Sequence, residues 1–600
     1  MSGKGWFMGA WFKTGLLASA LVLTSVSGAA VERGESAEEK LQLLFQDERA
    51  YYYQENPGTG PRGKPRPVAD HLSAQALKDH QRRAARNEEF LNRLEAINRN
   101  RLDEEGQLNY DMFRYMVESR LLEAKHRTWR QPLFSDSGFH TYPTRAWQSI
   151  NFRTAEDYRA YIRWLKDIPR YLAENTEHMR TGMKEGFTMP KVVLDGLMPS
   201  FDVLAKGGAD AIPFYGAFVN MAATLSDSDK AALRAEAKNV IADEVIPAYA
   251  ALAQFMREAY YPAARESLGI SEVPGGAAYY EDMVRYYTTI DISADEVHQI
   301  GLKEVARIRA AMESIIAEVG FEGSFQDFLT FLRTDPQFYA KTEKELLMFA
   351  SYLAKKVDGK LPSLFGKLPR QPYGVEPVPA VLAPNYTTGR YSGAPLDAPR
   401  GGEYWVNTYA LDKRPLYTLP ALTLHEAVPG HHLQIALSKE LENVPEFRLN
   451  QYPHAFGEGW GLYSERLGEE IGLYETPYER FGRLTYEMWR ACRLVIDTGI
   501  HSKGWTREEA IKLLTENSAL SEHNIRTEVD RYIAWPGQAL AYKMGELKIV
   551  ELRQKATKAL GDKFDVRAFH DKVLSAGGIP LYILEARIDG WVQSELNEGQ

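Results

Sequence analysis

Three histidines and a glutamate stand close together in the segment Leu424–His432, whose sequence is LHEAVPGHH. Histidines one helical turn apart can bind a zinc ion from one face of a helix, and a glutamate beside the first can activate a water at the open position. His425 and Glu426 have this relation, but residue 429, one turn after His425, is a proline and cannot bind a metal. The second histidine ligand must therefore be His431 or His432.

The interruption at Pro429 and Gly430 decides which histidine can reach the metal. On a straight helix His431 would lie roughly 120° from His425 around the axis, whereas His432 would lie roughly 10 Å further along it. Proline can kink a helix and glycine permits unusual backbone angles, so we expect a distorted helix. Because bulged helices are frequent at functional sites, we prefer His431 as the second ligand and keep His432 as the alternate.

A third ligand is expected from the segment Gly457–Tyr463 (GEGWGLY), further along the chain. Glu458 lies between two glycines, which allow close backbone approach, at the start of an apolar helical pattern. A carboxylate that faces inward from such a helix needs a partner, which is a metal ion or, in the alternative interpretation, an arginine or lysine. Glu465 follows on the same helical face and is the reserve candidate.

The order and spacing of four sequence blocks between His425 and Gly545 carry a family resemblance. The blocks are HEAVPGHHLQ, GEGWGLYSE, DTGIH and RYIAWPGQALAYKMG, and with them the chain resembles the bacterial family catalogued as domain of unknown function 885. This resemblance implies a distant branch of the zinc metallopeptidases, because GEGWGLYSE is similar to the third-ligand segment of aminopeptidase N-type enzymes. The helical plan is similar to that of thimet-type oligopeptidases and thermostable carboxypeptidases, although likeness of fold does not fix a substrate. The chain departs from those peptidases at Pro429-Gly430.

Asp497 and His501 stand four residues apart in the block DTGIH and can meet on one face of a helix. A metal-bound histidine normally donates its second ring nitrogen to a carboxylate, so Asp497 could orient a ligand while His501 faces the substrate. The alternative is a buried, hydrogen-bonded pair with a structural role.

The last block adds candidates around Pro536-Gly537-Gln538. Tyr542 could polarise a scissile carbonyl, and Arg531 or Lys543 could hold a peptide carboxylate. Tyr391, upstream of the metal helix, belongs to a tyrosine-containing segment that is expected to line the same cleft. Each of these side chains could instead be structural or solvated, but as a set near a metal helix we expect one or two to be functional.

The first residues follow the three-part plan of a secretory signal. Lys4 and Lys13 precede an apolar run from Leu16 to Val26, and small residues follow, so residues 1–29 are expected to be a cleaved signal peptide. The run is short for a membrane span, and no cysteine stands near the cleavage region, which argues against a lipoprotein. We therefore expect a periplasmic or secreted protein without stable membrane insertion.

Composition and periodicity predict a mainly α fold. With 44% apolar residues and a net charge of −9, the chain has material for a large core but no electrostatic footprint for nucleic acid. Apolar spacing and capping signals predict a helix between Ser293 and Gly320 and a helix start at Thr476. No flexible linker is present, so we expect one large, two-lobed, metallopeptidase-like domain, with a helical N-terminal lobe over residues 30–360 and a zinc-site lobe over residues 361–600.

Strand signals are confined to the stretch before the metal helix, in the runs Val375–Leu382 and Glu403–Tyr409. These runs predict a small β-sheet next to the metal helix. An exposed edge strand there could pair with an extended peptide, and the alternative is a purely structural hairpin.

The favoured interpretation is a zinc-dependent peptidase for short or unfolded peptides, of the oligopeptidase or carboxypeptidase type. Glu426 would be the general base, and Tyr542 or His501 would help to polarise the carbonyl. Two alternatives stay open: a catalytically silent protein that binds peptides or another ligand, and a zinc hydrolase of a non-peptide amide or ester. Zinc is the expected cofactor and a peptide is the expected partner.

Overall fold

Helices make up most of the molecule. The computed structural model describes residues 35–597, except residues 63, 381, 382, 397, 399 and 450. The expected signal peptide, residues 1–29, lies outside the described residues. The described residues contain many helices and one three-stranded sheet, so the predicted mainly α fold is confirmed.

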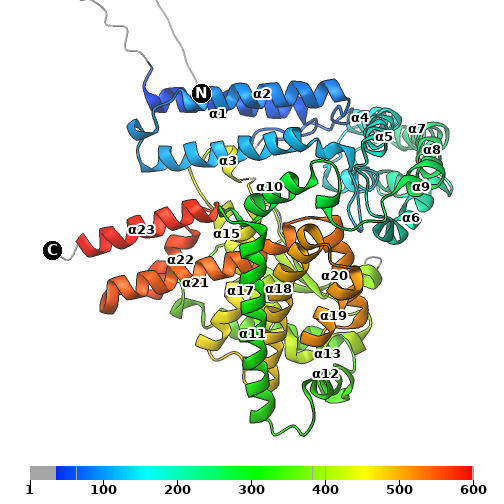
Figure 1. Cartoon of the computed structure of the whole chain (residues 1–600). Helices are drawn as coiled ribbons and strands as arrows, with labels where there is room; N and C mark the ends of the chain where they lie inside the picture. Colours follow the sequence, from blue (N-terminus) through cyan, green and yellow to red (C-terminus); the bar gives the residue numbers. More distant parts are fainter. Residues whose placement is uncertain are drawn as a thin grey trace, which may run out of the picture.

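The N-terminal helices form two groups in Figure 1. A layer of three long helices lies along one side of the molecule, and a compact bundle of shorter helices lies beside it. The layer contains α1 (Ala37–Glu55), α2 (Leu77–Glu95) and α3 (Glu104–His126). The bundle contains α4 (Ala155–Lys166), α5 (Ile168–Glu185), α6 (Lys191–Ala205), α7 (Asp227–Val240), α8 (Ile246–Phe255) and α9 (Tyr261–Ala263).

The remaining helices form the body that carries the candidate site. Before the sheet these are α10 (Gly276–Thr288), α11 (Ala294–Glu318), α12 (Phe325–Thr334) and α13 (Glu343–Asp358). After the sheet come α14 (Leu419–Glu426), α15 (His431–Lys439), α16 (Glu446–Leu449), α17 (His454–Glu470), α18 (Pro477–Lys503), α19 (Arg507–Asn517), α20 (Glu522–Ala534), α21 (Ala541–Leu560), α22 (Val566–Leu574) and α23 (Leu581–Asn597). Among the described residues, no helix is both long and apolar enough to cross a bilayer.

Local capping signals fix the ends of the two longest body helices. Ser293 and Glu296 form the predicted capping box of α11, and Gly320 follows its end with a positive φ of 65°. Thr476 forms a capping box with Glu479 at the start of α18. These predictions are confirmed because each depends on residues within one helical turn.

Helices from both sides of residue 360 pack together. α11 runs along α18, and α10 contacts α17, α18 and α21. One large apolar core also contains residues from both parts of the chain. The division into lobes at residue 360 therefore stays a prediction, and helices that precede it help to position the site.

The small sheet precedes the metal helix, as predicted. It consists of β1 (Tyr373–Pro377), β2 (Gly389–Ser392) and β3 (Gly402–Val406) in the order β1-β3-β2. β1 runs parallel to β3, and β2 runs antiparallel to it. The two predicted runs overlap β1 and β3, whereas the four-residue β2 was too short to predict.

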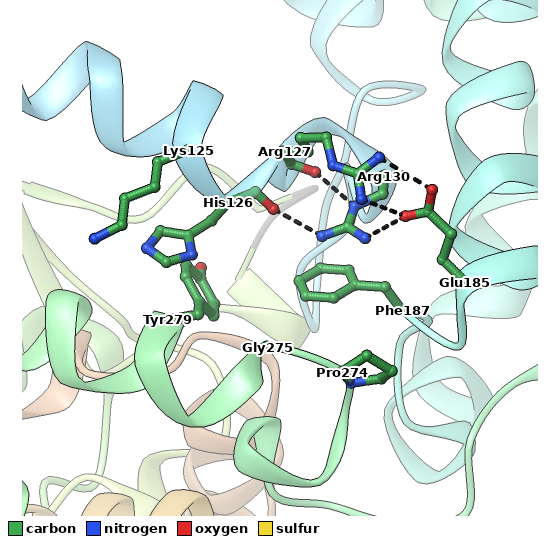
Figure 2. A pocket seen from close by; sticks show the side chains of 9 residues that line it. All are labelled: Lys125, His126, Arg127, Arg130, Glu185, Phe187, Pro274, Gly275 and Tyr279. Carbon is green, nitrogen blue, oxygen red and sulfur yellow. Dashed lines mark hydrogen bonds and ion pairs between the residues drawn. The ribbon is translucent and has the colours of Figure 1, made fainter.

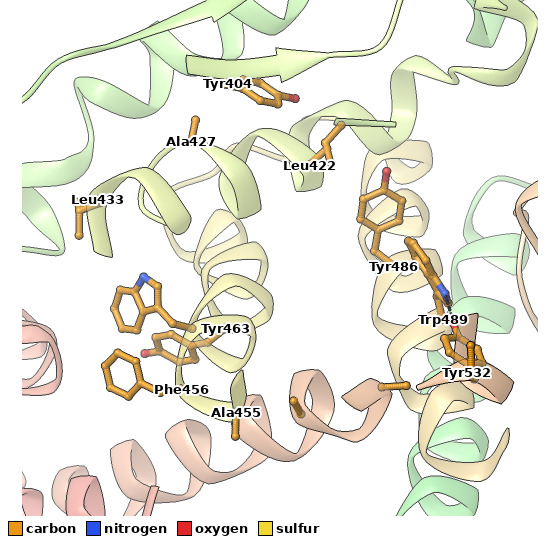
Figure 3. Close-up of a cluster of buried hydrophobic side chains, with 14 of the residues drawn as sticks. Tyr404, Leu422, Ala427, Leu433, Ala455, Phe456, Tyr463, Tyr486, Trp489 and Tyr532 are labelled. Atoms are coloured by element: carbon orange, nitrogen blue, oxygen red, sulfur yellow. Dashed lines mark hydrogen bonds between the residues drawn. The ribbon is translucent and has the colours of Figure 1, made fainter. Parts of the chain in front are cut away.

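The sheet and the metal helices share one core. Figure 3 shows Tyr404 of β3 next to α14, Phe456 and Tyr463 on α17, and Trp489 on α18. All four side chains are buried. Apolar packing therefore holds the elements that carry the candidate ligands in fixed relative positions.

Candidate metal centre

The predicted interruption of the metal helix is present. α14 ends and α15 begins on either side of the segment 427–430, and the peptide bond before Pro429 is cis. The carbonyl oxygen of Pro429 accepts a hydrogen bond from the indole of Trp460 at 2.8 Å, which ties the interruption to α17. A Cβ at Gly430 would lie 2.0 Å from the carbonyl oxygen of His425, so the chain can return this closely only with glycine at that position.

This return brings His431 back to His425. One donor atom from each of His425, His431 and Glu458 lies within 4.8 Å of the other two. Oε2 of Glu458 lies 3.6 Å from Nε2 of His425 and 3.5 Å from Nε2 of His431. Tetrahedral zinc with nitrogen and oxygen ligands at roughly 2.0–2.1 Å separates neighbouring donors by about 3.3 Å. The three donors therefore fit a tetrahedral zinc ion with one position open to water or substrate.

Residues on one face of α17 contact the ring of His425 on two of its sides. Glu458, Gly461 and Glu465 are spaced by one helical turn each, so they share that face. A Cβ at Gly461 would lie 2.7 Å from the imidazole of His425, so the missing side chain leaves the space in which this ring lies. Nδ1 of His425 lies 2.8 Å from Oε1 of Glu465, whose side chain is 1% exposed.

Glu465 is thus the orienting carboxylate, a role that the sequence analysis gave to Asp497. A carboxylate on Nδ1 fixes the orientation and tautomer of the ring and leaves Nε2 for a metal. The sequence had identified Glu465 only as a reserve ligand on the same helical face.

Burial and charge shift the pKa values of the clustered side chains in opposite directions. Burial lowers the pKa of His425, but hydrogen bonds to Glu458 and Glu465 outweigh burial and raise this pKa to about 10. Burial raises the pKa of Glu458, whereas His425 and His431 hold it well below its usual value. A metal ion held by these donors would take the place of the histidine proton, so protons and metal would compete for them.

Glu426 lies beside the three donors without belonging to them. Its Oε2 accepts a hydrogen bond from the backbone N–H of Tyr391 in β2 at 2.8 Å. Its negative charge contributes to the raised pKa of His425, which places it near the ligands. This is the position expected of a base that acts next to a metal without binding it.

Tyr452 is a candidate residue that the sequence analysis missed. Its hydroxyl donates a hydrogen bond to Oε1 of Glu458 at 3.3 Å, and it is 39% exposed. A Cβ at Gly457 would lie 2.4 Å from its ring, so this glycine makes room for the tyrosine. The available signal was a tyrosine directly before the helix start at Pro453-His454.

His432, the alternate ligand, faces the sheet and does not join the three donors. Its Nδ1 lies 3.0 Å from the hydroxyl of Tyr391, and its ring centre lies 4.6 Å from that of Tyr373. Burial lowers its pKa to about 4. Tyr391 is buried and supports His432 through its side chain, so the expected role of this tyrosine in lining a substrate cleft is not supported.

Asp497 and His501 are fully buried in α18 and bond to other groups. The hydroxyl of Tyr280 donates to Asp497 at 2.6 Å, and burial raises the pKa of Asp497 to about 7. Nδ1 of His501 accepts from the backbone N–H of Ile270 at 3.1 Å, and Nε2 lies 2.9 Å from the carbonyl oxygen of Tyr532. Because both ring nitrogens are used, His501 has none left for a substrate, and its assigned catalytic role is corrected to a structural one.

Lys543 also requires a correction. Its side chain is 0% exposed, and its ammonium lies 2.8 Å from carboxylate oxygens of Glu487 and Glu546 and 3.1 Å from Glu304. These carboxylates come from α18, α21 and α11 respectively. Lys543 therefore joins three helices through a buried ion cluster and is not accessible to a substrate carboxylate.

Arg531 and Tyr542 lie together at the edge of the site. Arg531 donates to the side-chain oxygen of Gln538 at 2.5 Å and to the hydroxyl of Tyr542 at 3.4 Å, and it lies 3.4 Å from Glu528. Both residues are partly exposed. The partners of Arg531 already satisfy much of its guanidinium, which weakens its assignment as a carboxylate-binding residue.

A close contact between helix backbones fixes the position of α17 relative to α21. A Cβ at Gly459 would lie 2.5 Å from the backbone of Gly545 in α21, and a Cβ at Gly545 would lie 1.9 Å from the carbonyl oxygen of Ala455. The backbones of α17 and α21 are therefore in direct contact, one residue from Glu458. The glycine after Glu458 serves this packing, whereas the sequence analysis had connected it to the metal.

Two cavities lie away from the three donors. The one in Figure 2 has a volume of about 450 Å³, and its Arg127 and Arg130 are paired with Glu185. The other has a volume of about 650 Å³ and lies between α13 and the start of α18. Neither cavity is lined by a candidate ligand, so we place the functional site by its donor chemistry.

The protein is mainly α and brings a buried pair of histidines and a glutamate close enough together that they could hold a metal ion. The family described as "Bacterial protein of unknown function (DUF885)" matches residues 59–588, and the chain belongs to it. No curated protein gave a significant match.

Two solved structures are similar to this chain. "The putative lipoprotein from Colwellia psychrerythraea" is 29% identical, with a TM-score of 0.85 over 93% of this chain and 100% of that chain. A "putative lipoprotein of unknown function from Shewanella oneidensis" is 18% identical, with a TM-score of 0.70 over 92% of this chain and 99% of that chain. The second likeness concerns the fold alone.

Proposed function

We propose that this protein is a zinc-dependent hydrolase that cleaves peptide bonds. The observation that carries the proposal is the set of three donors, His425, His431 and Glu458, together with Glu465 on Nδ1 of the first histidine. A structural zinc site normally has four protein ligands, whereas a catalytic one has three and an open position. Three donors next to a glutamate base favour the catalytic kind.

The residues present fit zinc better than a hard cation such as Mg²⁺ or Ca²⁺. Two imidazoles and one carboxylate are ligands typical of catalytic zinc, whereas Mg²⁺ and Ca²⁺ prefer sets made of oxygen. A zinc ion held there would supply a Lewis acid that activates water and polarises a carbonyl.

Two side chains of this protein would move or hold protons during the reaction. Glu426 accepts the proton of the attacking water and passes it to the leaving amine. Its hydrogen bond to the backbone of Tyr391 keeps the carboxylate beside the donors. Tyr452 is exposed, and its hydroxyl would turn from its long hydrogen bond with Glu458 to donate to the oxygen on which negative charge develops. Tyr452 takes the place that the sequence analysis gave to His501.

We further propose that the enzyme acts on short or unfolded peptides outside the cytoplasm. The signal-like first residues support a periplasmic or secreted location. The similar protein from Colwellia psychrerythraea, described as a putative lipoprotein, agrees with a location beyond the cytoplasmic membrane. A comparison of peptides with free and amidated C-termini would distinguish oligopeptidase from carboxypeptidase cleavage.

The test is a zinc determination combined with a peptide digest. The purified protein is expected to hold close to one zinc ion per chain, and His425→Ala is expected to lose it. Glu426→Gln is expected to keep zinc and fold but to lose about 10²- to 10⁴-fold in rate, as is typical when a general base is removed. Equal zinc contents in wild type and His425→Ala would refute the donor set. Full activity of Glu426→Gln would refute the assigned base.

The catalytically silent alternative predicts a different result. Such a protein would bind peptides with the same affinity in wild type and His425→Ala and would release no fragments. Cleavage of ester or non-peptide amide substrates, with peptides left intact, would instead favour the alternative of a zinc hydrolase that acts on a non-peptide amide or ester.

A further inference from the structure

Arg390 occupies a position in β2 next to the residue that holds the proposed base. The N–H of Asn407 donates to the carbonyl of Thr388, so Thr388 and every second residue after it direct their backbone groups toward β3. Gly389 and Tyr391 therefore direct theirs to the outer edge, where the N–H of Tyr391 reaches Glu426. Arg390 stands between these two edge residues.

The side chain of Arg390 projects from the face of β2 opposite to that of Tyr391. Successive side chains of a strand alternate between its faces. Tyr391 turns inward to His432, and Arg390 is exposed. α14 covers the face of β2 to which Tyr391 points, because a Cβ at Gly389, which would share that face, would lie 3.1 Å from Leu422.

The charges near Arg390 are those of the metal site. Burial acts to lower the pKa of Arg390, but Tyr386, Glu426 and Glu458 outweigh burial, and the net shift of this pKa is upward. The guanidinium thus lies within the electrostatic reach of both the proposed base and the proposed third ligand. Within the described part of the chain, no carboxylate approaches it within 4.0 Å.

Other cations near the site are already engaged or buried. Lys543 is enclosed by three carboxylates, and Arg493 is buried with Glu528 at 2.9 Å. Arg490 is 5% exposed and lies 3.6 Å from Glu465. Arg390 is the cation in this group that is both exposed and free of an ion pair among the described residues.

We infer that Arg390 binds a carboxylate of the substrate close to the scissile bond. The inference rests on the proposed zinc-dependent hydrolysis and narrows its substrate class to peptides that carry such a group. A guanidinium presents a planar fork of N–H donors that matches the two oxygens of a carboxylate. The α-carboxylate of a C-terminal residue and the side-chain carboxylate of aspartate or glutamate have this same chemistry.

The first experiment compares matched peptides cleaved by wild type, Arg390→Gln and Arg390→Lys. Wild type is expected to prefer peptides with a free C-terminal acid over amidated ones by about 10- to 100-fold, the range for a hydrogen bond to a charged group. Arg390→Gln is expected to lose this preference while it keeps zinc and thermal stability. Arg390→Lys is expected to keep part of the preference, because it retains the charge but not the fork.

Two further comparisons distinguish recognition of a C-terminal carboxylate from recognition of a side-chain carboxylate. Amidated peptides with aspartate or asparagine beside the cleaved bond test a side-chain carboxylate. A preference for the free C-terminus supports C-terminal recognition, and a preference for aspartate alone assigns Arg390 to acidic residues within the peptide. Arg466→Gln is the matched control, because Arg466 is exposed on α17, the helix that carries Glu458. It is expected to behave as wild type.

The outcomes separate this inference from the proposed function. An active wild type that cleaves acid and amide peptides equally, or an Arg390→Gln variant with an unchanged preference, would overturn the inference and leave the hydrolase standing. If wild type cleaves nothing, calorimetric binding of the same acid and amide peptides to wild type and Arg390→Gln decides the role of Arg390. Equal binding of the acid and amide peptides by both proteins would also overturn the inference.

Discussion

The hydrogen bond between Glu465 and His425 allows a quantitative test of the candidate metal centre. The change is Glu465→Gln, which keeps the shape of the side chain and removes its charge. The carboxylate is almost fully buried and lies 2.8 Å from Nδ1 of the ring, so the contact is a charge-assisted hydrogen bond in a dry environment. Hydrogen bonds of this kind contribute about 1.5–3 kcal/mol.

The expected result is a weaker zinc site in a folded protein. Loss of a carboxylate that orients a histidine ligand typically lowers metal affinity about 10- to 100-fold. This range corresponds to about 1.4–2.7 kcal/mol, in agreement with the value from the hydrogen bond itself. Because the three donor atoms remain, zinc should still bind at saturating concentration.

The assay is a competition titration of zinc against a chelator of known affinity, with circular dichroism as the measure of folding. Glu469→Gln is the matched control, because Glu469 lies on the same helix, has a side chain 46% exposed and pairs with Arg483 at 2.8 Å. Its zinc affinity should equal that of wild type. A Glu465→Gln variant with wild-type affinity, or an equal loss in both variants, would refute the reasoning.

Three other predictions follow from the geometry. His431→Ala should abolish zinc binding, whereas His432→Ala should keep zinc and lower the melting temperature. Metal analysis of both variants decides which histidine is the second ligand. The reverse result would make His432 the second ligand. Gly461→Ala should weaken zinc binding by 10-fold or more because its Cβ would lie 2.7 Å from the first histidine ligand. Gly590→Ala, where a Cβ meets nothing within 4 Å, should leave zinc unchanged and raise helix stability by up to about 1 kcal/mol in a thermal melt. Asp497 has a pKa raised from 3.8 to about 7 by burial, so its ionisation costs folding free energy, and stability attributable to it is lost as the pH rises from about 4 to about 7. Asp497→Asn should remove up to about 4 kcal/mol of that pH dependence in melts recorded across this range, and an unchanged pH profile would contradict the assignment.

Local signals in the sequence predicted the helices well and identified three side chains, those of His425, His431 and Glu458, that the structure brings together. The ends of α11 and α18 depend on capping residues within one turn, and such contacts can be recognised from the sequence alone. The pairing of His425 with His431 could be preferred because proline and glycine have strong backbone preferences. The spacing of Glu458 and Glu465 on one helical face was also visible as periodicity.

Contacts between distant segments could not be predicted in the same way. Lys543 looked like a single basic residue, because its three carboxylate partners lie on helices that are far apart in the sequence. His501 looked available, because the backbone groups that use its two ring nitrogens belong to segments around residues 270 and 532. Tyr452 became a candidate only after the structure placed its hydroxyl on Glu458.

The backbone contact between α17 and α21 has a mechanical consequence. At Gly459 and Gly545 no side chain stands between the two helices, so no rotamer change can absorb a displacement of one against the other. A movement of α21 would be transmitted to Glu458, the residue directly before Gly459, and would alter its distance from His425 and His431. Force applied to the C-terminal helices, by a bound partner or by an engineered crosslink, would thus be sensed at the proposed metal site although α21 supplies none of the three candidate ligands.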